Sequence, residues 1–504
     1  MVCHGNGSRR ASRSARSCSK LCGSRTHFRT AQSGRALAGL ADNEHWDGLR
    51  EAAASHAEQA VQVARRSGSE LALAAALNSR AATSIGRTTS AALQDVEQAF
   101  RLAKTCGSAA DVTHATIWRV NLLHELGRIS DAATAAREVF EQGLRGGDLN
   151  WGYFLAGMAA AELLYLGRWD ECRDLLREAL AARRGGIPGA LVRLTAAQLA
   201  VRTGDRAQAR QHLDRALELV SVDFPGLRGS IAEVGAEVLL AEGDPAGALD
   251  WVLTLMELEV NLDPDDAAEM LVWVAAAAAD IAQAARDSGD RAGAAHAVTA
   301  LEDLVATFPV EPCSPENAED VVRRLRQALL TAEVARCRGD AGQAALWEQS
   351  VERSRAAQAR WDEATSLWRW AQAAVAGRAA RAQVGRILRQ AHALATELGA
   401  VPLLGQVESL ARLAKVGLVE PVRVADTTTL PGVLVGLTGR EHEILSFLVV
   451  GRSNTEIAAS LVISAKTVSV HVSNILRKTG TTSRTEAAVL AGRLGCRGTE
   501  TGAD

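Results

Sequence analysis

The sequence predicts an all-α protein, in which a long solenoid of helix pairs is followed by a compact bundle of four short helices. Hydrophobic residues make up 47% of the 504 residues and aromatic residues only 4%, a mixture that favours packed helices over sheets. Proline is scarce, at 10 residues, which suits long helices. Glycines recur in the middle of the chain at a spacing typical of helix pairs, and helix-capping signals recur near its end.

The first 41 residues form a basic, low-complexity segment. They contain eight basic residues and no acidic one, and they lack the apolar segment of a secretory signal. We expect residues 1–41 to be disordered. A basic arm that touches nucleic acid and a start codon placed too far upstream are the alternative explanations.

Residues 42–415 are predicted to form a domain of helical repeats. A glycine is followed five residues later by a small residue, and successive glycines lie 37 to 50 residues apart. Glycine supplies the left-handed turn that ends one helix, and the small residue lets the next helix pack closely against it. Because such pairs cannot bury their apolar faces alone, they stack into a solenoid. The pairs are Gly86 with Ala91, Gly127 with Ala132, Gly167 with Cys172, Gly204 with Ala209, Gly243 with Ala248, Gly289 with Ala294 and Gly339 with Ala344.

The array resembles tetratricopeptide-type repeats over roughly residues 45–410. Its period is longer than the usual ~34 residues, and its aromatic positions are not filled consistently. The resemblance implies an architecture and says little about function. An irregular all-α bundle is the alternative.

A change of composition separates the array from the end of the chain. Residues 416–436 are rich in threonine and contain prolines, which predicts a linker. Residues 42–436 contain 40 basic and 53 acidic residues, whereas residues 437–495 contain seven basic and four acidic ones, and residues 496–504 form a short tail. The acidic body is unsuited to binding nucleic acid by charge, whereas the basic segment suits it.

Four helices are predicted in residues 437–495, over about 439–450, 454–461, 464–479 and 484–494. Three begin with a Ser/Thr-x-x-Glu capping box, in which the hydroxyl and the carboxylate cap the first turn reciprocally. The third helix has Thr467 in place of the glutamate, and a helix that meets phosphate should have no carboxylate in its first turn. Its apolar arc, expected in the core, consists of Val468, Val472, Ile475 and Leu476. This layout is typical of a helix-turn-helix DNA-binding domain.

An ordered set of residues gives this domain a family resemblance. Leu437-Thr-Gly-Arg-Glu441, Gly451-Arg-Ser-Asn-Thr-Glu-Ile-Ala458 and Ile463-Ser-Ala-Lys-Thr-Val468 follow one another at fixed spacing. The set resembles the C-terminal domain of LuxR-type transcription regulators. The resemblance implies binding to double-stranded DNA, with the third helix, residues 464–479, in the major groove, and a homodimer on DNA through the last helix, residues 483–494.

The exposed arc of the third helix and the start of the second supply the candidate DNA contacts. We expect phosphate contacts from Ser453, Asn454, Lys466, Thr467 and Lys478. Base contacts are expected from Ser469, Val470 and Ser473, and Arg477 suits either role. Asn474 shares the arc, and His471 lies at its edge, where packing against the first helix is the alternative.

The resemblance also shows a departure. LuxR-type domains often have lysine at the positions that match Ser469 and Ser473. With hydroxyls there, we expect fewer strong base contacts and a salt dependence flatter by about two phosphate equivalents.

No catalytic, cofactor or metal site is predicted. The five lysines lie outside any G-x-x-x-x-G-K-[ST] loop, and neither H-E-x-x-H nor G-x-S-x-G is present. The eight cysteines lack metal-ligand spacing, as expected for reduced thiols of a cytoplasmic protein. No apolar run reaches the ~18–20 residues of a membrane span, since Asp280 interrupts the best one.

The sequence therefore predicts a sequence-specific transcription regulator whose repeat domain senses a ligand or a partner protein. The alternative is a repeat scaffold with a non-functional or protein-binding tail. One subfamily of large LuxR-type regulators joins an ATPase, helical repeats and this tail. The chain resembles the last two parts, and we expect it to be the C-terminal part of such a regulator, truncated or encoded without the ATPase.

Overall fold

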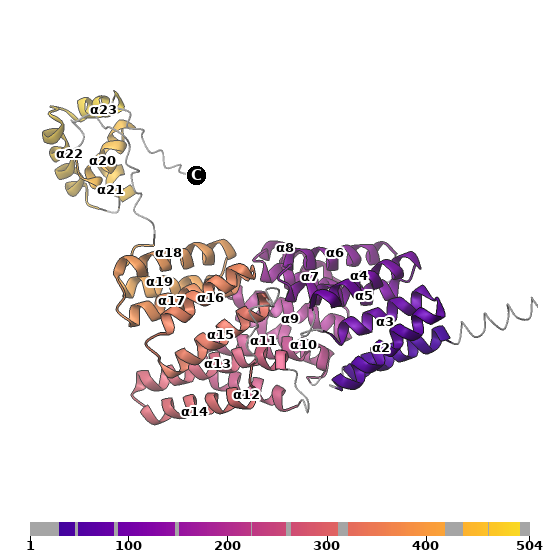
Figure 1. The fold of residues 1–504 in the computed structure, drawn as a ribbon. Helices are drawn as coiled ribbons and strands as arrows, with labels where there is room; N and C mark the ends of the chain where they lie inside the picture. The colour runs from indigo at the N-terminus through magenta and orange to yellow at the C-terminus, as the bar shows by residue number, and fades with distance from the viewer. Residues whose placement is uncertain are drawn as a thin grey trace, which may run out of the picture. The chain divides into compact units, whose positions relative to one another are not determined.

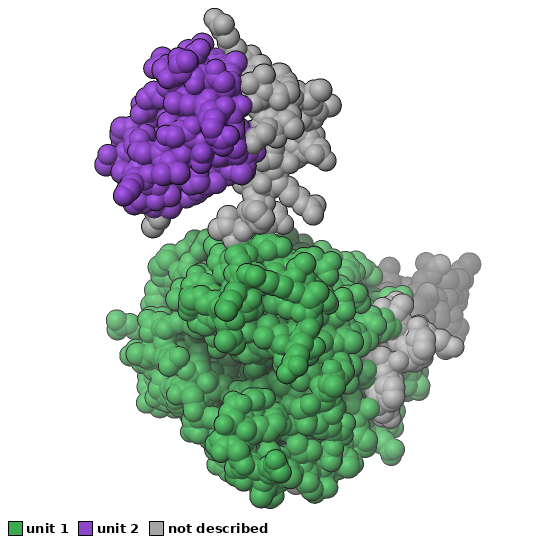
Figure 2. Space-filling view, turned by 90° about the vertical axis from the view of Figure 1, so that its left-hand side faces the viewer, with its two compact units in different colours: residues 1–419 green, residues 420–504 purple. Residues whose placement is uncertain are grey.

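The structure is a computed structural model that describes residues 30–45, 49–84, 89–146, 151–222, 224–258, 264–310, 321–418, 437–461 and 463–493. Within these ranges every regular element is an α-helix, which confirms the predicted fold class. The chain divides into two compact units, residues 1–419 and residues 420–504 (Figure 2). The linker predicted at 416–436 lies outside the described residues from 419 onward.

The first unit is a stack of antiparallel helix pairs (Figure 1). Each helix packs on the next along the chain, and helices two apart, such as α7 and α9, also pack together. The helices are α2 (Arg50–Ser67), α3 (Glu70–Ala82), α4 (Thr89–Thr105), α5 (Ala109–Glu125), α6 (Ile129–Gly146), α7 (Gly152–Tyr165), α8 (Trp169–Ala181), α9 (Gly186–Thr203), α10 (Arg206–Leu219), α11 (Pro225–Glu242), α12 (Pro245–Glu257), α13 (Pro264–Ser288), α14 (Arg291–Thr307), α15 (Val321–Arg338), α16 (Gln343–Ala356), α17 (Arg360–Ala376), α18 (Arg381–Leu398) and α19 (Val401–Leu413).

The predicted turn glycines end their helices as expected. Gly127, Gly167, Gly204, Gly243, Gly289 and Gly339 all have φ between +71° and +99°. Five of the six small residues that follow them are buried, and Ala344 is half-buried. Gly86 lies outside the described residues. The structure adds left-handed turns at Gly68, Gly107 and Gly399, which the pattern missed because leucine or valine stands five residues after each.

Aspartates that follow three of these glycines cap the next helix, as the sequence suggests. The carboxylates of Asp205, Asp244 and Asp290 accept backbone N–H groups three residues on, at 3.0, 2.8 and 2.9 Å. Each bond satisfies a donor that the first turn leaves unpaired.

The array curls back on itself, which the sequence did not predict. Helix α15 packs on α5, and α19 packs on α9. The Arg326 guanidinium contacts the Glu125 carboxylate at 3.1 Å, across 201 residues of sequence. The rings of Trp169 and Trp361 lie 6.0 Å apart. The inner helices of distant repeats therefore face one another and share a core.

The N-terminal boundary differs from the prediction that residues 1–41 are disordered. Residues 30–45 form a helix, whose Ala38 and Ala41 are buried. Ala38 shares a small core cluster with Val61 and Leu77. The basic composition concealed this helix, because only Ala31, Ala38 and Ala41 mark its inner face, while Ala36 is exposed. Residues 1–29 lie outside the described residues.

Helix α13 corrects the expectation that no apolar segment of the chain is long enough to span a membrane. By length and composition alone, its segment Ala267–Ser288 could cross a membrane. In the structure Met270, Leu271 and Val274 are buried in the core of the first unit. Asp280, which interrupts the apolar run in sequence, pairs with Arg336 at 2.5 Å. Helix α13 is thus a core helix of the array.

One glycine inside α11 gives a test of this packing. A Cβ at Gly235 would overlap the indole of Trp251, whose Nε1–H donates to the Ile231 carbonyl at 3.1 Å. We expect Gly235→Ala to destabilise the first unit by about 1–3 kcal/mol, because the indole must move. The matched control is Gly229→Ala in the same helix, where the new methyl group meets nothing and should stabilise by about 0.5–1 kcal/mol.

Thermal unfolding followed by tryptophan fluorescence measures both variants, because all ten tryptophans lie in the first unit. Equal midpoints for the two variants would contradict the close packing of Gly235 on Trp251.

Candidate nucleic-acid interface

The second unit is a bundle of four helices: α20 (Gly439–Val449), α21 (Asn454–Leu461), α22 (Ala465–Thr479) and α23 (Arg484–Arg493). Each lies within two residues of its predicted bounds. The core contains residues from all four helices, including Ile444, Leu445, Ile457, Ala487 and Ala491. The apolar face of α22 packs in this core, which fixes the position of the helix in the domain.

Helix caps fix where the helices of this unit begin. Thr438 and Glu441 form a complete capping box, and so do Ser453 and Glu456. The third predicted box is displaced by one residue. The Glu486 carboxylate accepts from the backbone N–H of Thr482 at 2.7 Å, although the Glu486 N–H still donates to Ser483 Oγ.

The start of α22 has the expected uncharged cap. Ser464 Oγ accepts the Thr467 N–H at 3.0 Å, and the two hydroxyls lie 2.7 Å apart. No acidic residue lies on α22, so its N-terminus is electrostatically open to an anion.

The two arcs of α22 are as predicted. Val468, Val472 and Ile475 are buried and Leu476 is partly buried in the domain core. The opposite arc is exposed at Lys466, Thr467, Ser469, Val470, Ser473 and Arg477, whereas His471 and Asn474 are half-buried. Val470 leaves 56% of its surface exposed, which is unusual for a valine in a small domain and suits a contact surface.

The hydroxyls of the two serines on the exposed arc donate hydrogen bonds to backbone carbonyls of α22 itself. Ser469 donates to the Ala465 carbonyl at 3.1 Å, and Ser473 donates to the Ser469 carbonyl at 3.0 Å. Ser469 also accepts from the Asn454 amide at 3.0 Å. In this arrangement Ser473 offers an incoming base a hydrogen-bond acceptor.

Asn454 and Arg484 hold three helices together. The Asn454 amide reaches α22 through Ser469, and its oxygen lies 3.5 Å from an Arg484 guanidinium nitrogen. Arg484 also donates to the backbone carbonyl of Arg452. The structure therefore places the Asn454 side chain in hydrogen bonds between helices, which the sequence did not predict, and its phosphate contact stays a prediction. The positioning role of Arg484 was missed because no local pattern signals it.

Lys478 forms an ion pair that the sequence did not predict, and its phosphate contact stays a prediction. Its ammonium lies 2.6 Å from the Glu441 carboxylate, whose side chain is only 4% exposed. The same carboxylate oxygen accepts the Thr438 N–H at 2.7 Å. Lys478 thus bridges α22 to the capping box of α20. The described cations of α22 that form no ion pair with a described residue are Lys466 and Arg477.

This contact predicts acid sensitivity of the domain. Hydrogen bonds from Lys478 and the Thr438 backbone hold the pKa of Glu441 at about 2, below its ordinary 4.5. Because the folded pKa is the lower one, the stabilisation is complete above pH ~4.5 and is lost as the pH falls toward 2. The protection of α20 peptides against hydrogen exchange, measured by mass spectrometry and corrected for the intrinsic pH dependence of amide exchange, should therefore fall through this window.

Glu441→Gln is the matched control, since the amide keeps the hydrogen-bond geometry and cannot titrate in this range. Capping hydrogen bonds also lower the pKa values of Glu456 and Glu486. Only the part of the pH dependence that disappears in Glu441→Gln therefore belongs to the titration of Glu441, which both Lys478 and the Thr438 backbone N–H stabilise in its charged form. An unchanged profile would contradict the assignment.

Comparison with known proteins assigns a family to the four-helix segment of the second unit. Residues 435–491 match the family described as "Bacterial regulatory proteins, luxR family". This segment is a LuxR-type helix-turn-helix domain. The match confirms the LuxR-type resemblance that the order of the sequence motifs indicated.

The curated relatives are transcription regulators that share this domain. It is 48% identical over 62 residues to the "Uncharacterized transcriptional regulatory protein YhcZ" of Bacillus subtilis, covering 12% of this chain and 29% of that protein. It is 49% identical over 57 residues to LiaR of Bacillus subtilis, covering 11% and 27%, and 51% identical over 55 residues to VraR of Staphylococcus aureus, covering 11% and 26%. The chain thus spans less than a third of the length of these relatives.

Solved structures match the repeats only loosely. The tetratricopeptide domain of P58(IPK) aligns with 76% of this chain and 99% of its own length, at 15% identity and a TM-score of 0.20. A circular tandem repeat protein aligns with 78% and 96%, at 17% identity and a TM-score of 0.15.

Proposed function

We propose that this chain is a sequence-specific, DNA-binding transcription regulator that inserts α22 into the major groove. The supporting observation is the exposed arc of α22 within a LuxR-type domain. That arc combines Lys466 and Arg477, which form no ion pair with a described residue, with an exposed Val470, and it contains no carboxylate. Such a surface suits a polyanion with readable base edges.

The contacts can be assigned by chemistry. Lys466, Thr467 and the first-turn N–H groups of α22 bind phosphate, with Ser453 on the flanking strand. Val470 meets a thymine methyl group, and Ser473 accepts from a base amino group. Arg477 contacts either phosphate or a base edge.

Two further elements complete the proposal. Helix α23 pairs two domains on a two-fold DNA site, and its Val489, 50% exposed, is an apolar residue available for that contact. The repeat unit senses an effector, either a small molecule or a protein. A regulator of this kind acts in the cytoplasm, where its DNA is.

Mobility-shift assays with a salt titration test the DNA contacts. Lys466→Ala and Arg477→Ala should each weaken binding to all sequences by about tenfold. If each side chain pairs with one phosphate, each variant should also make the negative slope of log K against log salt less steep by about 0.9. Ser473→Ala should instead change the preference among sequences. Arg177→Ala, an exposed arginine of the first unit, is the matched control and should change nothing.

The outcome that rejects the proposal is equally concrete. If the full chain binds every promoter tried, its own included, no tighter than about 10⁻⁴–10⁻⁶ M, the binding is non-specific. The tail would then serve the alternative function, as a protein-binding module of a repeat scaffold.

A further inference from the structure

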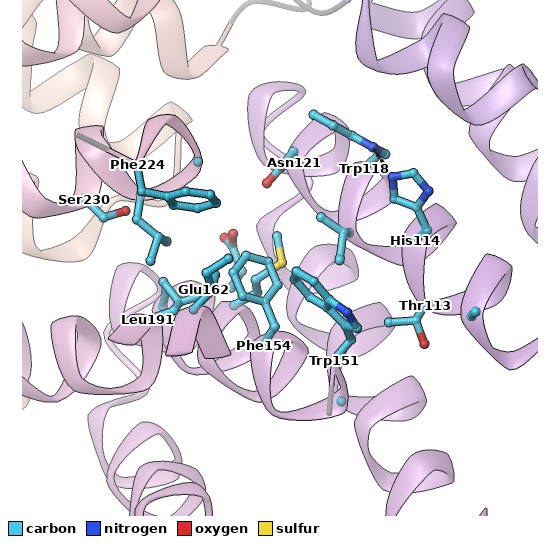
Figure 3. Close-up of a pocket in the computed structure, with 18 residues that line it drawn as sticks. Thr113, His114, Trp118, Asn121, Trp151, Phe154, Glu162, Leu191, Phe224 and Ser230 are labelled. Carbon is cyan, nitrogen blue, oxygen red and sulfur yellow. Dashed lines mark hydrogen bonds between the residues drawn. The ribbon is translucent and has the colours of Figure 1, made fainter. Parts of the chain in front are cut away.

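The inner face of the repeat unit contains a cavity of about 690 Å³ (Figure 3). Its walls come from α5, α7, α9 and α11, which are the first helices of successive pairs. This volume lies within the range of small-molecule sites. We call it the aromatic cavity, because its walls include the rings of Trp118, Trp151, Phe154 and Phe224.

The polar groups of the aromatic cavity are few and specific. Glu162 projects its carboxylate toward the space between Phe224 and Asn121 (Figure 3). One carboxylate oxygen bonds His124 Nδ1 at 2.8 Å, and the other has no hydrogen-bond partner among the described residues. The Asn121 amide also lacks a partner in the described part of the chain. Two hydrogen-bond acceptors are thus available at one place.

The charge of the lining restricts the ligand. Among the described residues that line the aromatic cavity, none is a lysine or arginine and the one basic side chain is His114, so a carboxylate or phosphate ligand would have no permanent counter-ion among them. The lining is mainly apolar, which disfavours a sugar, because its hydroxyls would lose hydrogen bonds to water. Aromatic faces beside a carboxylate instead attract an organic cation.

A second, smaller cavity of about 200 Å³ strengthens the argument. It shares Ala161 and Glu162 with the aromatic cavity. Its lining has four carboxylates against two arginines and one histidine, namely Glu162, Glu233, Glu269 and Asp362 against Arg202, Arg326 and His124. Burial, with repulsion from neighbouring carboxylates, raises the pKa of Glu233 to about 7. The carboxylates at this end of the site repel one another, and a bound cation would relieve that repulsion.

We propose that the aromatic cavity binds a hydrophobic amine. Its flat apolar body lies among Trp151, Phe154 and Phe224, and its protonated amino group donates to Glu162 and Asn121. The role of this ligand as the effector of a transcription regulator rests on the proposed function above, whereas the binding site itself does not.

The test uses the full chain and three probes with one naphthalene body: 2-(2-naphthyl)ethylamine, 2-(2-naphthyl)ethanol and 2-naphthylacetic acid. Isothermal titration calorimetry measures each affinity at pH 7. We expect the amine to bind about tenfold more tightly than the alcohol, and the acid to bind most weakly. Trp151→Ala should weaken the amine and the alcohol alike, because it removes part of the shared wall.

Glu162→Gln should reduce the amine to the affinity of the alcohol and leave the alcohol unchanged. Alcohol binding also shows that the variant is folded. The matched control is Glu178→Gln on the exposed face of α8. If Glu162→Gln fails to fold, Asn121→Leu replaces it, and the amine should again lose affinity selectively.

Three results would overturn the proposal: equal affinity for the acid and the amine, no binding of any probe up to about 1 mM, or an amine preference that survives in Glu162→Gln. The titration contains no DNA, so these results concern the amine site alone. The mobility-shift assay decides the DNA-binding function separately.

Discussion

Replacing Lys478 with methionine is expected to destabilise the LuxR-type domain by about 3 kcal/mol. The substitution would leave the Glu441 carboxylate, 4% exposed, with a backbone N–H of Thr438 as its main hydrogen-bond donor. A buried charge that loses its partner usually costs several kcal/mol, and a small domain has little stability to spare. Hydrogen exchange of peptides from residues 437–493, followed by mass spectrometry, measures the loss.

The double variant Glu441→Gln with Lys478→Met is the control for this effect. Because it removes both charges, it should recover most of the lost stability. A Lys478→Met protein with normal protection and weak DNA binding would contradict the structural role. It would restore Lys478 to the phosphate contacts that the sequence suggests.

The second large effect is expected at Arg202, in the first unit. Its guanidinium donates to both oxygens of Glu237, at 2.8 and 3.1 Å, and lies 5.1 Å from the centre of the Trp361 ring. The two side chains of the ion pair are 7% and 9% exposed. Arg202→Met should therefore destabilise the unit by about 3–5 kcal/mol, since it leaves Glu237 buried without its counter-ion.

Tryptophan fluorescence during thermal unfolding reports this change. Arg210→Met is the matched control, because Arg210 pairs with Glu242 at the surface of the same array. An exposed pair of this kind contributes at most about 1 kcal/mol. Similar losses for the two variants would show that burial does not determine the effect.

Local sequence patterns predicted where helices begin and end better than they predicted which distant side chains contact one another. The turn at Gly127 and the cap at Asp205 depend on residues within one helical turn, and both are found as expected. The two arcs of α22 follow from a period of 3.6 residues and are also confirmed. The role of Lys478 could not be predicted, because Glu441 is 37 residues away and already appeared to be explained by its capping box.

The candidate sites differ in the same way. The exposed arc of α22 lies on one helix, so its residues could be named from the sequence. The aromatic cavity required four helices from four repeats, and nothing in the sequence brings Asn121 and Phe224 to one place. The N-terminal boundary was predicted wrongly because the basic composition outweighed the signal of only three alanines on one helical face.

The contact between Arg326 and Glu125 has a consequence for how this protein evolves and how it can be engineered. In an open solenoid each repeat touches only its neighbours, so repeats can be added or deleted with a nearly additive effect. Here the late helices complete the core of the early ones, and a duplicated or deleted helix pair would separate α15 from α5 and α19 from α9. The number of repeats is therefore fixed by closure, and the unit should unfold as one cooperative body.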